Sequence, residues 1–179
     1  DTADSELWAL GGYMTAKLLW NPNYDANRAM SEFLEGYYGR AAAPIRACID
    51  LLHDHVEQKN IHVLLWAAPG SPHLDDQLLA KADECWQQAE GLVASEPEVL
   101  DRVKRSRMSV DYAILERARL QAQKKLPANE ALAKLAVNRF QPFCEALQSS
   151  ALTRLREGQL LDKQAYRRDL AKDLGLKTE

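Results

Sequence analysis

The sequence predicts an all-α protein, an irregular bundle of about six helices. Apolar residues recur every three or four positions through most of the 179 residues, which is the period of an amphipathic helix. Prolines, glycines and capping residues separate these periodic segments. Only residues 61–66 offer any strand signal, so a fold built from alternating strands and helices does not fit this chain.

The first predicted helix runs from about Ser5 to Trp20 and is apolar over a wide arc. Two neighbouring stripes make up this arc: Leu7, Gly11, Met14 and Leu18, and beside them Trp8, Gly12, Thr15 and Leu19. A helix with an apolar arc this wide must be buried against other segments on two of its sides. Gly11 and Gly12 would each weaken the helix by up to ~1 kcal/mol, so we expect another backbone to approach closely there. A helix this apolar also predicts a further segment upstream.

Asn21-Pro22 ends the first helix, because proline disfavours the helical conformation at the preceding residue. Asp25 is a suitable N-cap for the second helix, and Gly39 is placed to end it. Pro44 then lies in the first turn of a third helix. Its buried face is predicted from apolar residues at helical spacing: Ile45, Cys48, Ile49, Leu52 and Val56.

Residues 61–66 form a short apolar run for which periodicity leaves two alternatives. We expect an extended or irregular segment packed over the bundle, and a short strand is the alternative. The stretch from Pro69 to His73 is the clearest break in the chain. We interpret it as a loop within one domain, because the apolar stripes on both sides need partners.

The second half of the chain predicts a fourth helix over about 74–94 and a long fifth helix that ends near Lys125. Ser95-Glu96-Pro97-Glu98 has the pattern of a capping box that opens this fifth helix. A sixth helix begins near Asn129, and Pro142 predicts a kink or a break near Arg139.

At the end of the chain, the sequence predicts a connector and a short last helix. Residues 152–158 form the connector. Asp162 is placed to cap the last helix, with Tyr166 and Leu170 facing inward and Gly175 ending it.

The composition of the chain limits which classes of function we expect for it. The net charge of −3 gives no global field that would attract nucleic acid. No run approaches the roughly 18 apolar residues of a membrane span. The cysteines Cys48, Cys85 and Cys144 lie in helical patterns among apolar residues, which favours buried thiols; one disulfide plus one thiol is the alternative.

Several polar residues could belong to a functional site, but for each of them we favour a structural or solvent-exposed role. His53 and His55 point roughly 160° apart on a helix, so we expect no metal site. The remaining histidines are His62 and His73. Asp75 and Asp76 could serve acid–base chemistry on a sugar, but capping of the next helix fits better. Glu32 and Glu35 are expected to lie in solvent.

The basic cluster Arg102, Lys104, Arg105 and Arg107 could bind phosphate or an acidic sugar. We favour an exposed helix face, because acidic residues lie nearby and no stacking aromatic residues are interleaved. Trp20 and Trp66 each end a predicted element next to a proline loop, which makes them candidate contacts to a partner or substrate. No glycine-rich phosphate loop, nucleophile elbow or CxxC motif is present. We therefore expect no catalytic residue and no cofactor in this chain.

One region is specific enough to suggest a family. It reads AKLLWNP (16–22), then Asp25, EFLEGYYG (32–39), AAP (42–44) and DLLH (50–53). This pattern resembles the C-terminal region of bacterial glycoside-hydrolase-like proteins that contain domain of unknown function 4838, which are similar in plan to α-glucuronidases and the hexosaminidase clan. Weaker similarity continues in RVKRSRMSVDY (102–112) and TRLREG (153–158).

The resemblance implies that a (β/α)₈ barrel with the active site precedes this chain. Residues 1–22 would then connect to the barrel, and residues 23–179 would form a non-catalytic helical accessory domain that supports the barrel or mediates oligomerisation. The catalytic carboxylates would lie on the barrel, and none carries over to a residue here. Carbohydrate would be a ligand of the whole parent protein, which the resemblance implies is exported.

Two other classes of function remain as alternatives. A self-contained protein-interaction module should bury its first helix fully. A sugar-binding module should show Trp20 or Trp66 exposed beside polar groups.

Overall fold

The computed structural model describes residues 7–155 and 160–177. They form seven α-helices and one short 3-10 helix, η1 (Gly39–Ala41). The α-helices are α1 (Trp8–Trp20), α2 (Ala26–Tyr38), α3 (Ala42–Gln58), α4 (Asp76–Leu92), α5 (Pro97–Ala122), α6 (Glu130–Ser149) and α7 (Lys163–Asp173). No strand occurs in these residues, so the all-α class is confirmed and residues 61–66 are irregular.

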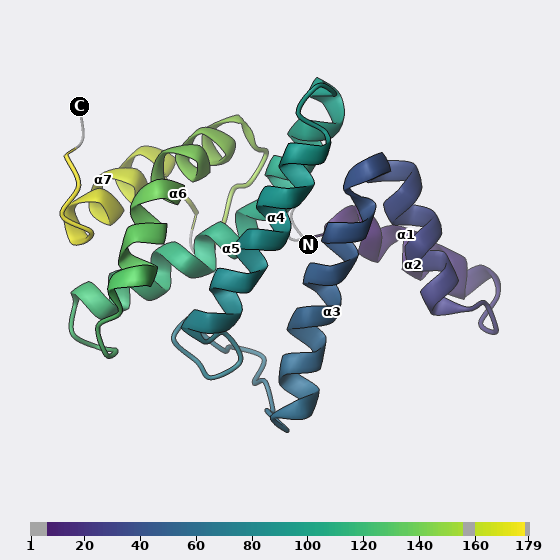
Figure 1. Cartoon of the computed structure of the whole chain (residues 1–179), viewed down its shortest axis with the longest axis horizontal. Coiled ribbons are helices and arrows are strands. Elements are labelled where there is room, and N and C mark those ends of the chain that lie inside the picture. Colours follow the sequence, from purple (N-terminus) through teal and green to yellow (C-terminus); the bar gives the residue numbers. More distant parts are fainter. Residues whose placement is uncertain (1–6, 156–159, 178–179) are drawn as a thin grey trace.

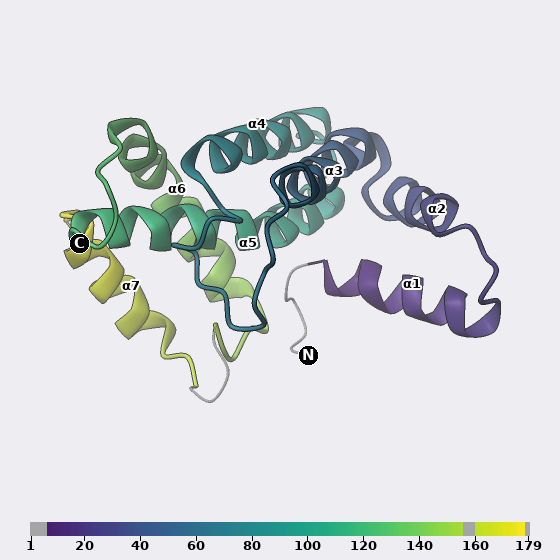
Figure 2. The same cartoon turned by 90° about the horizontal axis from the view of Figure 1, so that it is seen from below.

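The helices follow one another across an elongated molecule (Figure 1). α5 is the longest helix and contacts α2, α4, α6 and α7, whereas α1 packs mainly on α2. Figure 2 shows α1 below the helices α3 and α4, on the same side as the loop that joins those two helices. In the part of the chain that the structure describes, no helix combines the length and apolar character needed to cross a bilayer.

The core follows the stripes that the spacing predicts. On α3, Ile45, Cys48 and Ile49 are buried, while Leu52 and Val56 are half-buried. Cys144 is also buried and Cys85 is half-buried, in agreement with the predicted burial of the cysteines. The buried side chains of α5 and α6 include many apolar residues at helical spacing: Val103, Val110, Ala113, Ile114, Leu132, Ala136, Phe140, Phe143 and Leu147.

Several predicted helix ends are confirmed by their hydrogen bonds. Asp25 accepts from the Arg28 amide at 3.0 Å, and Asp162 accepts from the Gln164 and Ala165 amides at 3.0 and 2.9 Å. Gly39 and Gly175 have φ angles of 53° and 69°, in the left-handed region that glycine tolerates best. These interactions are local, which is why the sequence specifies them.

Two local expectations are wrong. Glu96, not Ser95, is the N-cap of α5 and makes no side-chain capping bond, because Pro97 already occupies the first helical position. The 63–66 segment does not pack over the bundle, since its four side chains are exposed. Of the two alternatives at Pro142, a break near Arg139 is excluded, because α6 continues through Pro142.

Two expectations extend past the described residues. The predicted start of the first helix at Ser5 lies outside them, and α1 is described from Trp8. The predicted connector over 152–158 is described only as far as Leu155.

Candidate functional site

The candidate contacts Trp20 and Trp66 are both strongly exposed, at 91% and 69%. The end of α1, where Trp20 lies, and the loop between α3 and α4, which carries Trp66, are well separated in Figures 1 and 2. Leu19 is 81% exposed beside Trp20, and Leu65 is 87% exposed beside Trp66. The structure therefore presents two separate apolar sites rather than one.

α1 is covered on one of its two apolar stripes only. Leu10 is buried, and Leu7, Met14 and Leu18 are half-buried on the side toward α2. The neighbouring stripe is entirely exposed: Trp8, Gly12, Thr15 and Leu19. A Cβ atom added at Gly11 or Gly12 would meet nothing within 4 Å, so the close backbone approach expected at these glycines is not found within the described chain.

Glu32 joins α1 to α2, so the expectation that it is merely solvated is wrong. Its carboxylate accepts hydrogen bonds from Tyr24 Oη at 2.8 Å, Lys17 Nζ at 3.1 Å, Arg28 Nε at 3.0 Å and Tyr13 Oη at 3.2 Å. The hydrogen bonds from Tyr24 and Lys17, foremost among these, lower the pKa of Glu32 to about 2. The carboxylate therefore stays charged and holds the α1–α2 hairpin together.

The basic cluster does not form one exposed face, because Arg107 is completely buried. Its guanidinium donates to Asp83, to Glu90 at 3.1 Å and to Asp111 at 3.3 Å. Arg139 forms a bidentate ion pair with Asp111, donating from Nε to Oδ1 at 2.9 Å and from Nη2 to Oδ2 at 2.8 Å. A charge this deeply buried is tolerated only when it is paired.

This ion network joins three helices. Asp83 and Glu90 come from α4, Arg107 and Asp111 from α5, and Arg139 from α6. Burial raises the pKa of Asp111, and the hydrogen bonds from Arg139 and Arg107 oppose that shift. Each carboxylate is engaged by an arginine, so the network ties the three helices together.

The other three members of the basic cluster have separate environments. Arg102 donates to the Tyr37 carbonyl at 3.0 Å, with its guanidinium 5.0 Å from the centre of the Tyr37 ring. Arg105 donates to Asp101 at 2.9 Å, and Lys104 is exposed. The prediction of an exposed face thus holds for Lys104 but not for Arg107.

Asp75 and Asp76 have different roles. Asp75 caps α4 by accepting from the Leu78 amide at 2.8 Å, as predicted. Asp76 instead accepts from Arg117, from Gln121 at 3.0 Å and from Asn129 at 2.8 Å. It therefore lies in the first turn of α4, as expected, and also links that helix to α5 and to the start of α6.

The histidines do not converge on one point. His53 and His62 are exposed, whereas His55 Nε2 lies 3.6 Å from Asp75 Oδ2. Burial, followed by the charges of His55 and Arg117, lowers the pKa of His73. Over residues 7–155 and 160–177, no group of three or more histidine, cysteine, aspartate or glutamate side chains is arranged to hold a metal ion.

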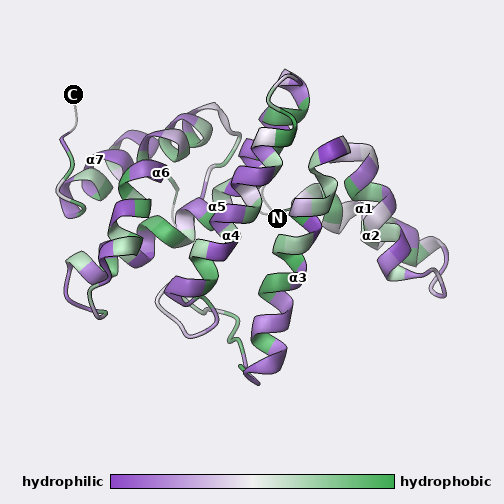
Figure 3. Cartoon of the chain, in the orientation of Figure 1, coloured by the Kyte–Doolittle hydropathy of each residue, from purple (hydrophilic) through white to green (hydrophobic). Residues whose placement is uncertain are grey.

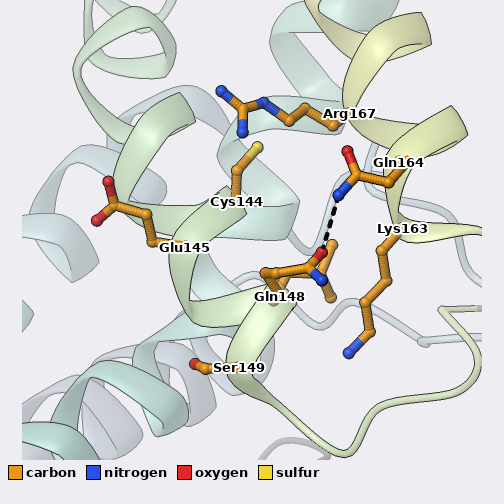
Figure 4. Close-up of a pocket in the computed structure, with 8 residues that line it drawn as sticks. Cys144, Glu145, Gln148, Ser149, Lys163, Gln164 and Arg167 are labelled. Atoms are coloured by element: carbon orange, nitrogen blue, oxygen red, sulfur yellow. Dashed lines mark hydrogen bonds between the residues drawn. The ribbon is translucent and has the colours of Figure 1, made fainter.

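Figure 4 shows a pocket between α6 and α7, with a volume of about 330 Å³. Cys144 lines it opposite Arg167, and Gln164 donates to Gln148 across it at 3.4 Å. Burial raises the pKa of the Cys144 thiol to about 11, so the thiol stays protonated at neutral pH. Because the thiolate is the nucleophilic form, the Cys144 thiol in this mostly apolar pocket is a weak nucleophile at neutral pH.

The comparisons with known proteins bear on the first part of the chain. No curated protein and no solved structure matches the sequence. The weaker similarities noted at 102–112 and 153–158 lie outside the family match. Residues 2–50, which include α1, α2 and the first half of α3, match the family described as "Domain of unknown function (DUF4838)".

Proposed function

We propose that this chain is a non-catalytic helical accessory domain of a carbohydrate-active, glycoside-hydrolase-like protein, and that α1 docks it against an upstream catalytic barrel. The observation that carries the proposal is the exposed stripe of α1. Its large members, Trp8 and Leu19, flank small ones, Gly12 and Thr15. Small residues let a partner come close, while the large ones provide apolar area to bury.

The location of this stripe favours docking over a free-standing module. α1 packs mainly on α2, and the Glu32 hydrogen bonds fix its orientation. A self-contained interaction module would bury its first helix, whereas here one whole stripe is open. The family match over residues 2–50 includes this helix, which supports a role shared with that family.

Sugar binding is the second candidate, because Trp20 and Trp66 are both exposed. Exposed tryptophan rings can stack on sugars; Trp20 lies between Leu19 and Asn21, and Trp66 lies between Leu65 and Ala67. Titration of this chain with oligosaccharides, followed by tryptophan fluorescence, tests this candidate. A saturable change that Trp66→Ala or Trp20→Ala abolishes would favour sugar binding over docking.

The main test compares the full polypeptide, containing this chain and whatever precedes it, with the 179-residue chain alone. Both are assayed on aryl-glycosides and uronic-acid oligosaccharides. Activity in the full polypeptide and none in this chain supports the proposal and identifies the sugar. Activity in this chain alone would contradict it.

A second measurement addresses docking itself. Leu19→Ser with Trp20→Ser in the full polypeptide should lower the melting temperature of the upstream domain, because apolar contact is lost. The matched control is Val137→Ser, a half-exposed apolar position on α6. Equal melting temperatures for both variants would argue against docking through α1.

A further inference from the structure

The loop between α3 and α4 carries the longest run of exposed apolar side chains in the described residues. Val63, Leu64, Leu65 and Trp66 follow one another, and each is exposed. Figure 3 shows part of this loop in the green of hydrophobic residues. Single exposed apolar residues are ordinary, but four in succession mark a surface that another molecule covers.

The loop is held in a defined shape although it has no regular secondary structure. At its start, the Ile61 amide donates to the Val56 carbonyl at 2.9 Å. At its tip, the Ala67 amide donates to the Leu64 carbonyl at 3.0 Å. A tip fixed in this way loses little conformational freedom on binding, which favours affinity.

The far side of the loop is fastened to α5. Arg117 donates to the Pro69 carbonyl at 3.1 Å and also pairs with Asp76. A Cβ atom on Gly70 would lie 2.9 Å from Leu120 Cδ1, so the backbone packs tightly against α5 here. The rigid bundle therefore positions the exposed tip.

The charge of the loop indicates the chemistry of its partner. Residues 61–72 contain no aspartate, glutamate, lysine or arginine. Anionic lipid surfaces attract segments rich in lysine and arginine, so the loop lacks that component of membrane binding. An uncharged apolar tip is complementary to an uncharged apolar pocket in a protein, and tryptophan is a frequent anchor in such pockets.

The position of the loop indicates which partner protein provides this apolar pocket. Of the ten large exposed apolar side chains among the described residues, three lie on α1 and four lie on residues 63–66. Figure 2 shows both segments on one side of the molecule, below α3 and α4. One partner placed on that side can contact both segments.

We infer that residues 63–66 are a second anchor of the interface proposed for α1 and insert into an apolar pocket of the same upstream domain. This inference rests on the proposed function, because it takes its partner from there. It adds that the partner has two contact regions, a surface that packs along α1 and a pocket for Leu65 and Trp66.

Hydrogen exchange tests the inference in the full polypeptide and in the 179-residue chain. Peptides covering residues 61–67 should exchange at least about tenfold more slowly in the full polypeptide. Leu65→Ser with Trp66→Ser should remove that protection, while Val137→Ser should leave it unchanged. Circular dichroism of each variant confirms that the helices remain folded.

The outcomes separate this inference from the proposal on which it rests. Protection of α1 with no protection of 61–67 would overturn the inference and leave the docking of α1 standing. Protection of neither segment would overturn both. Two outcomes with the isolated chain would also overturn the inference. Protection of residues 61–67 that grows with protein concentration would assign the loop to a second copy of the chain. Protection that appears on adding neutral or anionic vesicles would assign it to a lipid surface.

Discussion

At the scale of single residues, Glu32 shows how one carboxylate can decide the position of a helix. Its hydrogen bonds come from Tyr13 and Lys17 on α1, from Arg28 on α2 and from Tyr24 in the turn between them. The hydrogen bonds from Tyr24, Lys17 and Arg28 hold its pKa at about 2, below the ordinary value of 4.5. The contribution of Glu32 to the α1–α2 contact is therefore complete above pH 4.5 and is lost as the pH falls toward 2.

We predict that Glu32→Gln loosens α1 at neutral pH. The amide cannot accept the charge-assisted hydrogen bonds of Lys17 and Arg28 as strongly. Amides of residues 10–20 should exchange with solvent faster than in the wild type, and the wild-type rates should rise toward those of the variant as the pH falls from 4.5 to 2, after correction for intrinsic exchange. Glu35→Gln is the control, because Glu35 is exposed on the same helix. Equal exchange in the two variants would contradict the role given to Glu32.

Arg107 is the second residue whose role only the packing reveals. Replacing it with methionine leaves Asp83 buried without its partner from α5, and breaking a buried pair costs about 3–5 kcal/mol. We predict a loss of this size in the free energy of unfolding, measured with urea. Lys104→Met on the same helix should change it by less than about 0.5 kcal/mol. A small effect for Arg107→Met would contradict the role given to Arg107 in the buried network.

At the scale of elements, the helix ends are the best-specified features of the chain. Asp25, Asp75, Asn129 and Asp162 each cap the helix that follows, with side chain to amide distances of 2.8 to 3.1 Å. Such bonds connect residues two or three positions apart, so the sequence alone locates them. They leave open how the helices pack on one another.

Asp162 provides a test at this scale. We predict that Asp162→Ala lowers the free energy of unfolding by about 1 kcal/mol, the usual cost of losing an N-cap. The amides of the first turn of α7 should lose protection first, because Gln164 and Ala165 donate to this side chain. Asp169→Ala, at an exposed position within α7, should shift stability by less than about 0.5 kcal/mol. If the two variants behave alike, the cap does not stabilise α7.

At the scale of the whole molecule, α1 is attached to the rest of the chain mainly through α2. The division of the chain into residues 1–22 and 23–179 remains a prediction, and deleting the first part tests it. We predict that residues 23–179 still unfold in one cooperative transition, because the ion network around Arg107 and the contacts of α5 with α4 and α6 stay intact.

Circular dichroism and thermal unfolding of the shortened chain provide the measurement. The helical signal should fall only by the part that α1 contributes. A broad, non-cooperative transition would show that α1 belongs to the core and that the division at residue 22 is wrong. Phe33 packs against Tyr13 of α1, so some loss of stability is expected even if the division is right.

The sequence by itself determined the all-α class, the helix caps and most buried stripes, because these depend on residues within a few positions of each other. It also contained a signal for Arg107 that we interpreted wrongly. Arg107 lies four positions after Val103 and three before Val110, within an apolar stripe, and this spacing predicts burial. Only the tertiary structure decided which charges pair across α4, α5 and α6, since those partners are far apart along the chain. It also decided which apolar segments stay open: the outer stripe of α1 and residues 63–66 have the composition of core segments, and hydrophobicity alone does not say whether this chain or another molecule covers them.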